Sequence, residues 1–258
     1  MKRKFQLGFA LMLPIIIVVI LGFVVLLMMK GKVPRRTGQP GRPPTTFNLG
    51  VRFDKWDEST NMAGDFLFVA VPHYNNKVFL ENGELLGDHK RREIIPHPMY
   101  VLPPGTNIMS VTDGVVKEIK YQKEHDDYSL VIYPNDSSWT IDYDHVANVK
   151  VGSGDKVTAG DVIAEVPLAT GGLKQYNLGF TEIMIFKDSR NYEDNQTACL
   201  YDLLDPSVKD RFDAKIQQLV ADWEEFMGDR TIYDEDSWES VGCIYNQITE
   251  GEAMRGGK

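Results

Sequence analysis

The side chains with the greatest potential for chemistry in this 258-residue chain are its histidines and cysteines. The five histidines are His73, His89, His97, His125 and His145, and no two of them form an H-x-H motif. The two cysteines are not arranged as C-x-x-C or in a Cys/His cluster with the spacing of a metal site. The sequence also lacks a G-x-S-x-G nucleophile motif, an H-E-x-x-H zinc motif and a glycine-rich phosphate loop. No standard short motif therefore predicts an enzyme.

Cys199 and Cys243 could instead form one disulfide that closes a long loop, because oxidising compartments preserve such bonds. The alternative is two separate buried thiols, and the sequence leaves both open. Residues 135–137 and 195–197 fit the N-glycosylation pattern, which adds weak support for a location outside the cell.

The chemistry-bearing residues lie among short segments rich in β-branched and aromatic side chains, separated by Gly, Pro and Asn-Asp turns. These predicted strands are residues 66–71, 77–80, 107–111, 114–121, 128–133, 139–143 and 180–186. Short, closely spaced strands are typical of a sandwich or barrel and not of a βαβ fold. We therefore predict a mainly β domain over residues 47–205.

A C-terminal helix is predicted over residues 206–228. Asp205 can cap it, Pro206 suits the first helical position, and Gly228 can end it. Its apolar residues recur at helical spacing, so we expect this amphipathic helix to pack on the sheet. Residues 229–258 are acidic and then Gly-rich, and we expect an irregular tail with a docking segment near 238–245.

An uncharged run of 23 residues, 7–29, is long enough as a helix to span a hydrocarbon core of about 30 Å. The alternative is a cleaved signal peptide, but the run ends in Leu, Met and Lys and offers no A-x-A-like site. We predict a transmembrane anchor that follows a cytoplasmic tail of residues 1–6. Residues 30–46 are basic and rich in Pro and Gly, as expected of an extended linker.

The charge of the remaining chain limits its partners. Residues 45–258 carry 20 Lys and Arg against 37 Asp and Glu, a net charge of −17. Such a domain is repelled by nucleic acid phosphates and by an anionic lipid face. We therefore exclude nucleic acid as a partner and expect a single-pass membrane protein whose soluble domain is extracytoplasmic.

Four segments in order resemble the LytM-like domain of the M23 zinc metallopeptidases. A P-x-G-T-x-(V/I) stretch at 103–108 is followed by D-G-x-V at 113–116. The Y-x-H-(L/V) segment at 143–146 then precedes the double Gly-Asp pattern at 151–163. Biotinyl- and lipoyl-type modules share such Gly-Asp turns, but Lys156 is better interpreted as a solvated turn residue. The resemblance implies an M23-like β-sandwich.

The resemblance also implies a zinc site made by an H-x-x-x-D motif and the second histidine of H-x-H. Counting back from the Pro-Gly-Thr turn places Ile95 and Met99 at the first two ligand positions. The strand that should carry H-x-H reads LGFTEIMIF, with Phe180 near the imidazole positions. Only His145 fits its family position, which is that of a catalytic histidine. The implied site is degenerate.

A rebuilt metal site could use His97, His145 and Glu182, with Asp144 near them, because carboxylates can replace imidazoles as zinc ligands. Zinc is expected only if that site is rebuilt, and otherwise we expect no cofactor. Tyr100, Tyr143 and Tyr176 could line the former cleft and bind a ligand, although aromatic residues in strands more often pack the core.

Three functions follow from these patterns. The favoured one is a non-catalytic M23-like module that binds or regulates at the cell envelope, with a peptide, glycan-peptide or protein partner. The second is a divergent zinc metalloendopeptidase that acts on cell-wall or other peptides. The third is a structural envelope adaptor.

Overall fold

The computed structural model describes residues 41–70, 74–88, 91–188 and 194–253. The predicted span 7–29, the tail 1–6 and most of the linker 30–46 lie outside these residues. Within the described ranges, none of the helices combines the length and apolar character needed to cross a bilayer.

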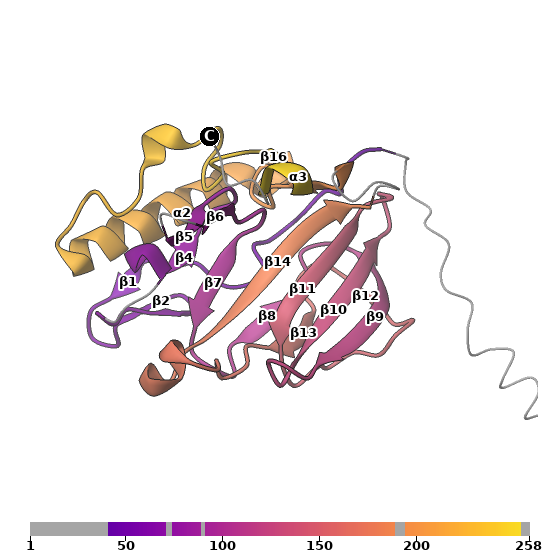
Figure 1. The fold of residues 1–258 in the computed structure, drawn as a ribbon, viewed down its shortest axis with the longest axis horizontal. Helices are drawn as coiled ribbons and strands as arrows, with labels where there is room; N and C mark the ends of the chain where they lie inside the picture. Colours follow the sequence, from indigo (N-terminus) through magenta and orange to yellow (C-terminus); the bar gives the residue numbers. More distant parts are fainter. Residues whose placement is uncertain (1–40, 71–73, 89–90, 189–193, 254–258) are drawn as a thin grey trace, which may run out of the picture. The chain divides into compact units, whose positions relative to one another are not determined.

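One antiparallel sheet organises the domain, and nine strands of the described residues belong to it (Figure 1). Its path runs β12–β9–β10–β11–β14–β15–β16, while β7 pairs with β14 and β4 pairs with β7. The strands are β4 (Phe79–Leu80), β7 (Met99–Leu102), β9 (Gly114–Gln122), β10 (Asp127–Pro134), β11 (Thr140–Val146), β12 (Lys156–Val157), β14 (Gly179–Lys187), β15 (Gln196–Ala198) and β16 (Gln247–Thr249). The mainly β prediction is confirmed.

The long strand β14 shows why these residues form a sheet with two different faces. Successive side chains of a strand point to opposite faces. Ile183 and Ile185 are fully buried in the main core, whereas Phe180, Glu182 and Met184 are half-buried on the other face. The neighbouring strand β11 alternates in the same way. The face opposite the core is therefore the one that can present polar groups.

Smaller sheets complete the fold. The core includes Ile108 and Ile163 from a two-stranded sheet of β8 (Asn107–Met109) and β13 (Val162–Glu165), seen behind β10 and β11 in Figure 1. The remaining small strands are β1 (Trp56–Asp57), β2 (Met62–Ala63), β3 (Phe66–Leu67), and the hairpin of β5 (Leu85–Asp88) with β6 (Arg91–Ile94). The hairpin was not predicted, because its sequence LLGDHKRREI has no clear alternation.

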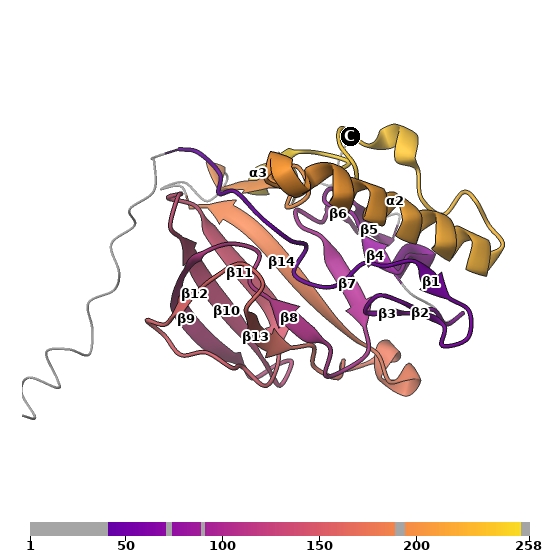
Figure 2. The ribbon, with the colours of Figure 1, turned by 180° about the vertical axis from the view of Figure 1, so that it is seen from behind.

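The predicted C-terminal helix is α2 (Pro206–Met227), which lies beside β1–β3 and β4 (Figure 2). Asp205 Oδ1 accepts a hydrogen bond from Ser207 N at 2.9 Å, and Gly228 ends the helix at φ 68°. Trp223 is fully buried, and its ring contacts Phe68 edge-on with centroids 5.0 Å apart. The helix therefore packs on the domain, as predicted. The short helix α3 (Glu250–Ala253) follows β16, and the 3-10 helices η1 (Tyr74–Asn76), η2 (Gly172–Tyr176) and η4 (Glu235–Ser237) lie in connections.

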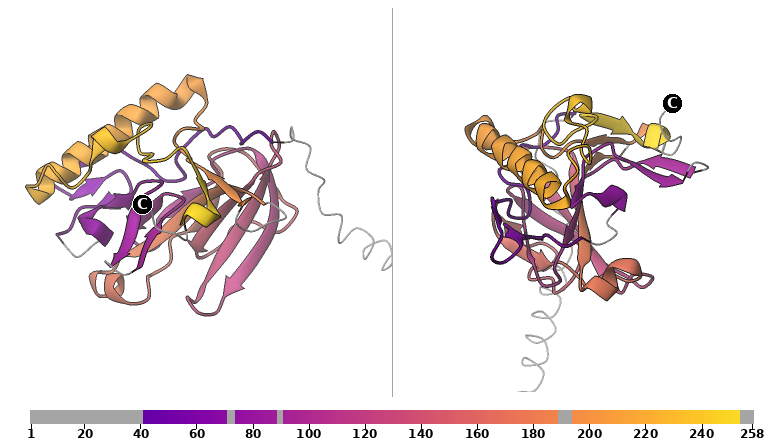
Figure 3. Two further views of the ribbon diagram at one scale, coloured as in Figure 1. Left: turned by 45° about the horizontal axis from the view of Figure 1, so that its top comes forward. Right: turned by 90° about the vertical axis from the view of Figure 1, so that its left-hand side faces the viewer.

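The segment after α2 folds back over the helix and ends beside the large sheet (Figure 3). Cys199 and Cys243 are joined by a disulfide, with Cα atoms 6.1 Å apart. The strand β16 then pairs with β15. The predicted irregular tail is thus partly ordered, because a covalent bond and a three-residue strand hold it, and such short contacts leave little trace in sequence.

A buried charged cluster of Lys77, Glu81 and Glu84 flanks β4. Lys77 Nζ donates to both carboxylate oxygens of Glu81, at 3.1 and 3.0 Å, and to Glu84 Oε2. Two carboxylates therefore share one ammonium group in a nearly dry place. Burial raises the pKa of Glu81 to about 7, with the charge of Lys77 opposing and that of Glu84 adding to the increase. The cluster carries a surplus negative charge when all three groups are ionised.

Replacing Lys77 with Met should reduce the free energy of unfolding by about 3–5 kcal/mol at pH 8, because two carboxylates would remain buried without a partner. Glu81→Gln should cost much less, because it leaves a balanced Lys77–Glu84 pair. Denaturant unfolding of the full chain, followed by circular dichroism, measures both.

The pH dependence of the free energy of unfolding distinguishes Glu81→Gln from the wild type. Ionised Glu81 costs stability because its folded pKa, about 7, exceeds the ordinary value of 4.5. The contribution of Glu81 to stability should therefore be lost as the pH rises from about 4.5 through 7, and the profile of Glu81→Gln should lack this part of the loss. Equal losses for Lys77→Met and Glu81→Gln, or parallel pH profiles for wild type and Glu81→Gln, would contradict this account.

Candidate functional site

A group of polar side chains lies on the face of the large sheet opposite the core. It comes from β10, β11 and β14, of which the last two lie side by side (Figure 1). Asp144 and Glu182 are directly paired across β11 and β14, and Asp142 pairs with Met184 one step along. The alternation of β11 that buries Ile141 and Tyr143 therefore turns Asp142 and Asp144 to this outer face.

His145 reaches the group through an irregularity in β11. The pairing register between β10 and β11 shifts by one residue here, and His145 has a left-handed backbone with φ 53°. Such bulges redirect a side chain away from the regular alternation. His145 Nδ1 lies 2.6 Å from Asp127 Oδ2, so the Asp127 carboxylate orients the imidazole. The other ring nitrogen, Nε2, is left for another partner.

Glu182 is held by the loop before β7. His97 Nε2 lies 3.0 Å from Glu182 Oε2. Burial alone would raise the pKa of Glu182, but the charge and hydrogen bond of His97 outweigh it and lower the pKa below its usual value. Glu182 is therefore an anion at neutral pH, with His97 as its partner.

Asp144 completes a set of three residues whose ligand atoms all lie within 4.8 Å of one another, namely Asp144, His145 and Glu182. Asp144 Oδ1 accepts a hydrogen bond from Gln122 Nε2 at 2.7 Å. The predicted set of His97, His145 and Glu182 is thus only partly assembled. His145 and Glu182 come together, Asp144 joins them, and His97 is an ion-pair partner of Glu182.

Apolar side chains occupy the same face beside these groups. Met99 on β7 pairs with Glu182 across the strands and is 3% exposed. Phe180, two residues before Glu182, contacts the ring of His145 with centroids 4.3 Å apart. Val101 lies beside Phe180 in a small apolar cluster with Leu173 and residues of the loop that follows β13. Where the resemblance implies a carboxylate ligand of zinc, the chain has the thioether of Met99, and a phenyl ring lies near the implied imidazole positions.

Two of the residues that were predicted to line a cleft are instead buried in the core. Tyr100 and Tyr143 are fully buried in the main core, and the Tyr143 hydroxyl accepts a hydrogen bond from Val111 N at 2.8 Å. The prediction that they line a cleft is wrong, because both occupy core-facing positions of their strands. Tyr176, in η2, remains 37% exposed.

Asp127 and Asp142 belong to the site but were not predicted. Burial, and then the charges of Asp144 and Glu182, raise the pKa of Asp142 to about 6, while the Ser129 hydroxyl that donates to it opposes the shift. Burial likewise raises the pKa of Asp127 against the effect of His145. The alternation of Ile141, Asp142, Tyr143 and Asp144 was the available signal that Asp142 shares the outer face with Asp144, whereas the contact of Asp127 with His145 depends on the bulge.

The sequence model of peptidase family M23 matches residues 99–191, which contain β7 to β14 and most of this site. Residues 99–191 are an M23 domain. The resemblance in the four turn and strand segments is thereby confirmed. A comparison with the sequences of curated proteins gives no significant match.

Several solved structures of M23 peptidases are similar to part of the chain. LytU is 22% identical, with a TM-score of 0.37, over 44% of this chain and 76% of LytU. The lysostaphin catalytic domain from Staphylococcus simulans is 14% identical, with a TM-score of 0.32, over 58% and 81% of the two chains. A zinc containing peptidase from Vibrio cholerae is 16% identical, with a TM-score of 0.34, over 56% and 36%. At these values the structural matches do not specify an activity.

The M23 zinc-ligand set does not fit this chain. M23 proteins are zinc metallopeptidases, but Ile95 has no donor atom and Met99 has only a thioether sulfur, a weak ligand for zinc. Glu182 lies on the strand that the resemblance implies should carry H-x-H. The group of Asp144, His145 and Glu182 is a different donor set, of residue types that zinc accepts.

Replacing Asp142 with Asn should raise the free energy of unfolding at pH 7.5 by on the order of 2 kcal/mol. The folded pKa of Asp142, about 6, exceeds the ordinary value of 3.8, so ionisation of this carboxylate destabilises the folded state. The stability that depends on its protonated form falls as the pH rises from 3.8 through 6. Asn also accepts the hydrogen bond from Ser129. The gain should vanish near pH 3.5, as measured by urea unfolding at both pH values; a constant difference would contradict the assignment.

Proposed function

We propose that this chain is a membrane-anchored M23-like domain without peptidase activity that binds or regulates a partner at the cell envelope. The observation that carries the proposal is Met99 beside Glu182, where the family resemblance implies a carboxylate ligand of zinc. A catalytic zinc needs three protein ligands that fix the metal and leave one position for water. At this point of the sheet the donors are replaced by apolar side chains.

The remaining polar groups support the same conclusion, because they bind one another. Glu182 pairs with His97, Asp127 with His145, and Asp142 with Ser129. Each pair joins residues from different strands or loops, so the pairs stabilise the face. Phe180 also covers one side of the His145 ring.

The M23 match and the charge of the domain support the choice of partner. The M23 match supports a peptide or glycan-peptide as the partner. Tyr176, in the loop beside the Phe180 cluster, is exposed and is our proposed contact residue. The uncharged run 7–29 and the net charge of −17 support an external location, tethered to the membrane.

Purified full-length chain should contain no stoichiometric zinc and should not cleave cell-wall peptides. Elemental analysis after exposure to zinc, followed by removal of the free metal, measures the first property, and a peptide cleavage assay measures the second. His145→Ala is the matched variant. One zinc per chain, together with cleavage that His145→Ala abolishes, would overturn the proposal.

The second candidate is a divergent zinc metallopeptidase, and the group of Asp144, His145 and Glu182 favours it. If it holds, Glu182→Gln should remove bound zinc while Glu118→Gln, on the exposed edge of β9, should not. Zinc binding without any cleavage would instead leave a structural metal site in a non-catalytic domain.

Membrane attachment is tested separately. In cells that express the full chain, we expect it to remain with membranes after an alkaline carbonate wash, because about 20 apolar residues suffice for a stable span. A protease added outside should digest residues 41–258. A variant without residues 7–29 should be soluble. Release by carbonate, or full protection from external protease, would contradict the proposed anchor or its orientation.

A further inference from the structure

A surface pocket of about 470 Å³ lies far along the chain from the M23 site. It is lined by Gln217 of α2, Glu235 of η4, Trp238, Ser240 and Val241. These residues fall outside the matched range 99–191. A volume of this size is within the range of small-ligand and side-chain pockets.

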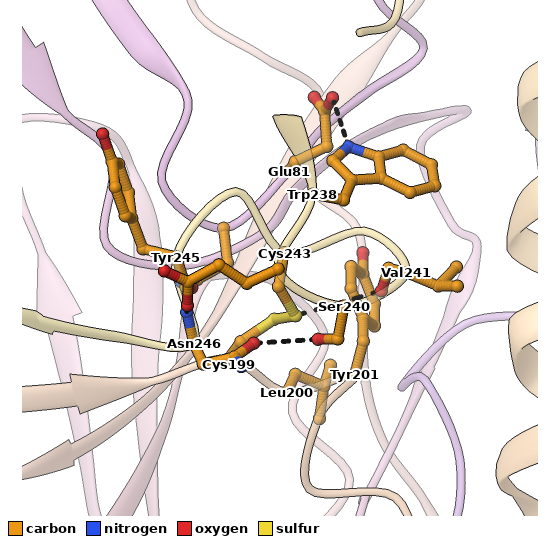
Figure 4. Close-up of a disulfide and its surroundings, with 12 residues drawn as sticks. Glu81, Cys199, Leu200, Tyr201, Trp238, Ser240, Val241, Cys243, Tyr245 and Asn246 are labelled. Carbon is orange, nitrogen blue, oxygen red and sulfur yellow. Dashed lines mark hydrogen bonds between the residues drawn. A yellow bond between two sulfur atoms is a disulfide. The ribbon is translucent and has the colours of Figure 1, made fainter. Parts of the chain in front are cut away.

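The segment that supplies Ser240 and Val241 to the pocket is held by a disulfide and by hydrogen bonds. The disulfide ties Cys243 to Cys199, and Cys243 N donates to Ser240 O at 2.8 Å (Figure 4). The Ser240 hydroxyl donates to Asn246 Oδ1 at 2.8 Å. A preformed site loses little conformational entropy on binding, which favours affinity.

Trp238 is the aromatic wall of the pocket. Its indole is half-buried, and its Nε1 points to Glu81 Oε1 at 3.4 Å (Figure 4). Glu81 belongs to the buried cluster in which two carboxylates share the ammonium group of Lys77. When Glu81 is ionised, the cluster therefore places a surplus negative charge beside the indole nitrogen in a poorly screened place, and the indole face itself attracts cations.

The rim adds charge of the same sign. Glu235 lines the pocket and is exposed, and none of the described lining residues is basic. The surrounding segment 229–239 has five acidic residues and one basic residue, Arg230. A phosphate, a nucleic acid or another anionic ligand would be repelled here.

We infer that the Trp238 pocket binds a lysine or arginine side chain presented by a partner polypeptide. An organic cation fits better than a metal ion, because only one lining residue has a carboxylate, whereas hard cations need several oxygen ligands. A polypeptide fits better than a free small molecule, because the acidic segment extends along the chain beyond the pocket. The inference does not depend on the function proposed for the M23 site.

Fluorescein-labelled hexa-arginine is the probe, and the neutral, nearly isosteric hexa-citrulline is its control. Anisotropy with the full chain in physiological salt should show binding of hexa-arginine and at least tenfold weaker binding of hexa-citrulline. Trp238→Ala should weaken hexa-arginine binding about tenfold, and Trp238→Phe, which keeps an aromatic face, only about threefold.

Charge reversal tests the pocket without touching its packed residues. Glu235→Lys, at an exposed position, should abolish the binding of hexa-arginine. Glu118→Lys makes the same change on the exposed part of β9, at the far edge of the sheet, and should leave binding within about twofold of the wild type. The inference is overturned if hexa-citrulline binds as tightly, if Glu235→Lys binds hexa-arginine like the wild type, or if both charge reversals weaken it equally.

Discussion

The strict alternation of side chains along β14 is the constraint on which the domain depends. This strand pairs with β11 along one edge and with β7 and β15 along the other, so its register fixes the position of three neighbours. A shift of one residue would turn Ile183 and Ile185 out of the core and bring Glu182 into it. The core therefore specifies where Glu182 stands, and with it where Asp144 and Met99 must lie.

The outer face shows what a sheet of this family requires when the metal ligands change. A cluster of carboxylates and imidazoles is costly in a half-buried place, unless a cation or mutual pairing compensates the charges. Here His97 contacts Glu182 and His145 contacts Asp127 through ring nitrogens, whereas burial raises the pKa of Asp142 to about 6. Apolar residues such as Met99 fill the rest. The polar groups of this face thus find their partners among one another.

Much of this arrangement could be predicted from local sequence, because its signals are local. The long strands β9, β10, β11 and β14, the Gly-Asp turns and both caps of α2 depend on residues within a few positions of one another, and these were predicted. The bulge at His145 and its pairing with Asp127 could not be, because they depend on the register between β10 and β11. Tyr100 and Tyr143 were misplaced for a related reason: an aromatic residue in a strand can face either side, and only the pairing decides.

The segments on either side of residues 99–191 depend on each other. Asn82 lies between β4 and β5, and its backbone and side chain form hydrogen bonds with the segment of residues 242 to 245. The disulfide joins Cys243 of the same segment to Cys199, which directly follows β15. The Lys77 cluster is closed on one side by Tyr233, whose ring lies 5.0 Å from Lys77 Nζ. Neither flank could bury these groups alone, because each supplies the other's polar partners. Their joint surface carries the Trp238 pocket, so the chain has built a second specific surface from parts that the M23 domain does not contain.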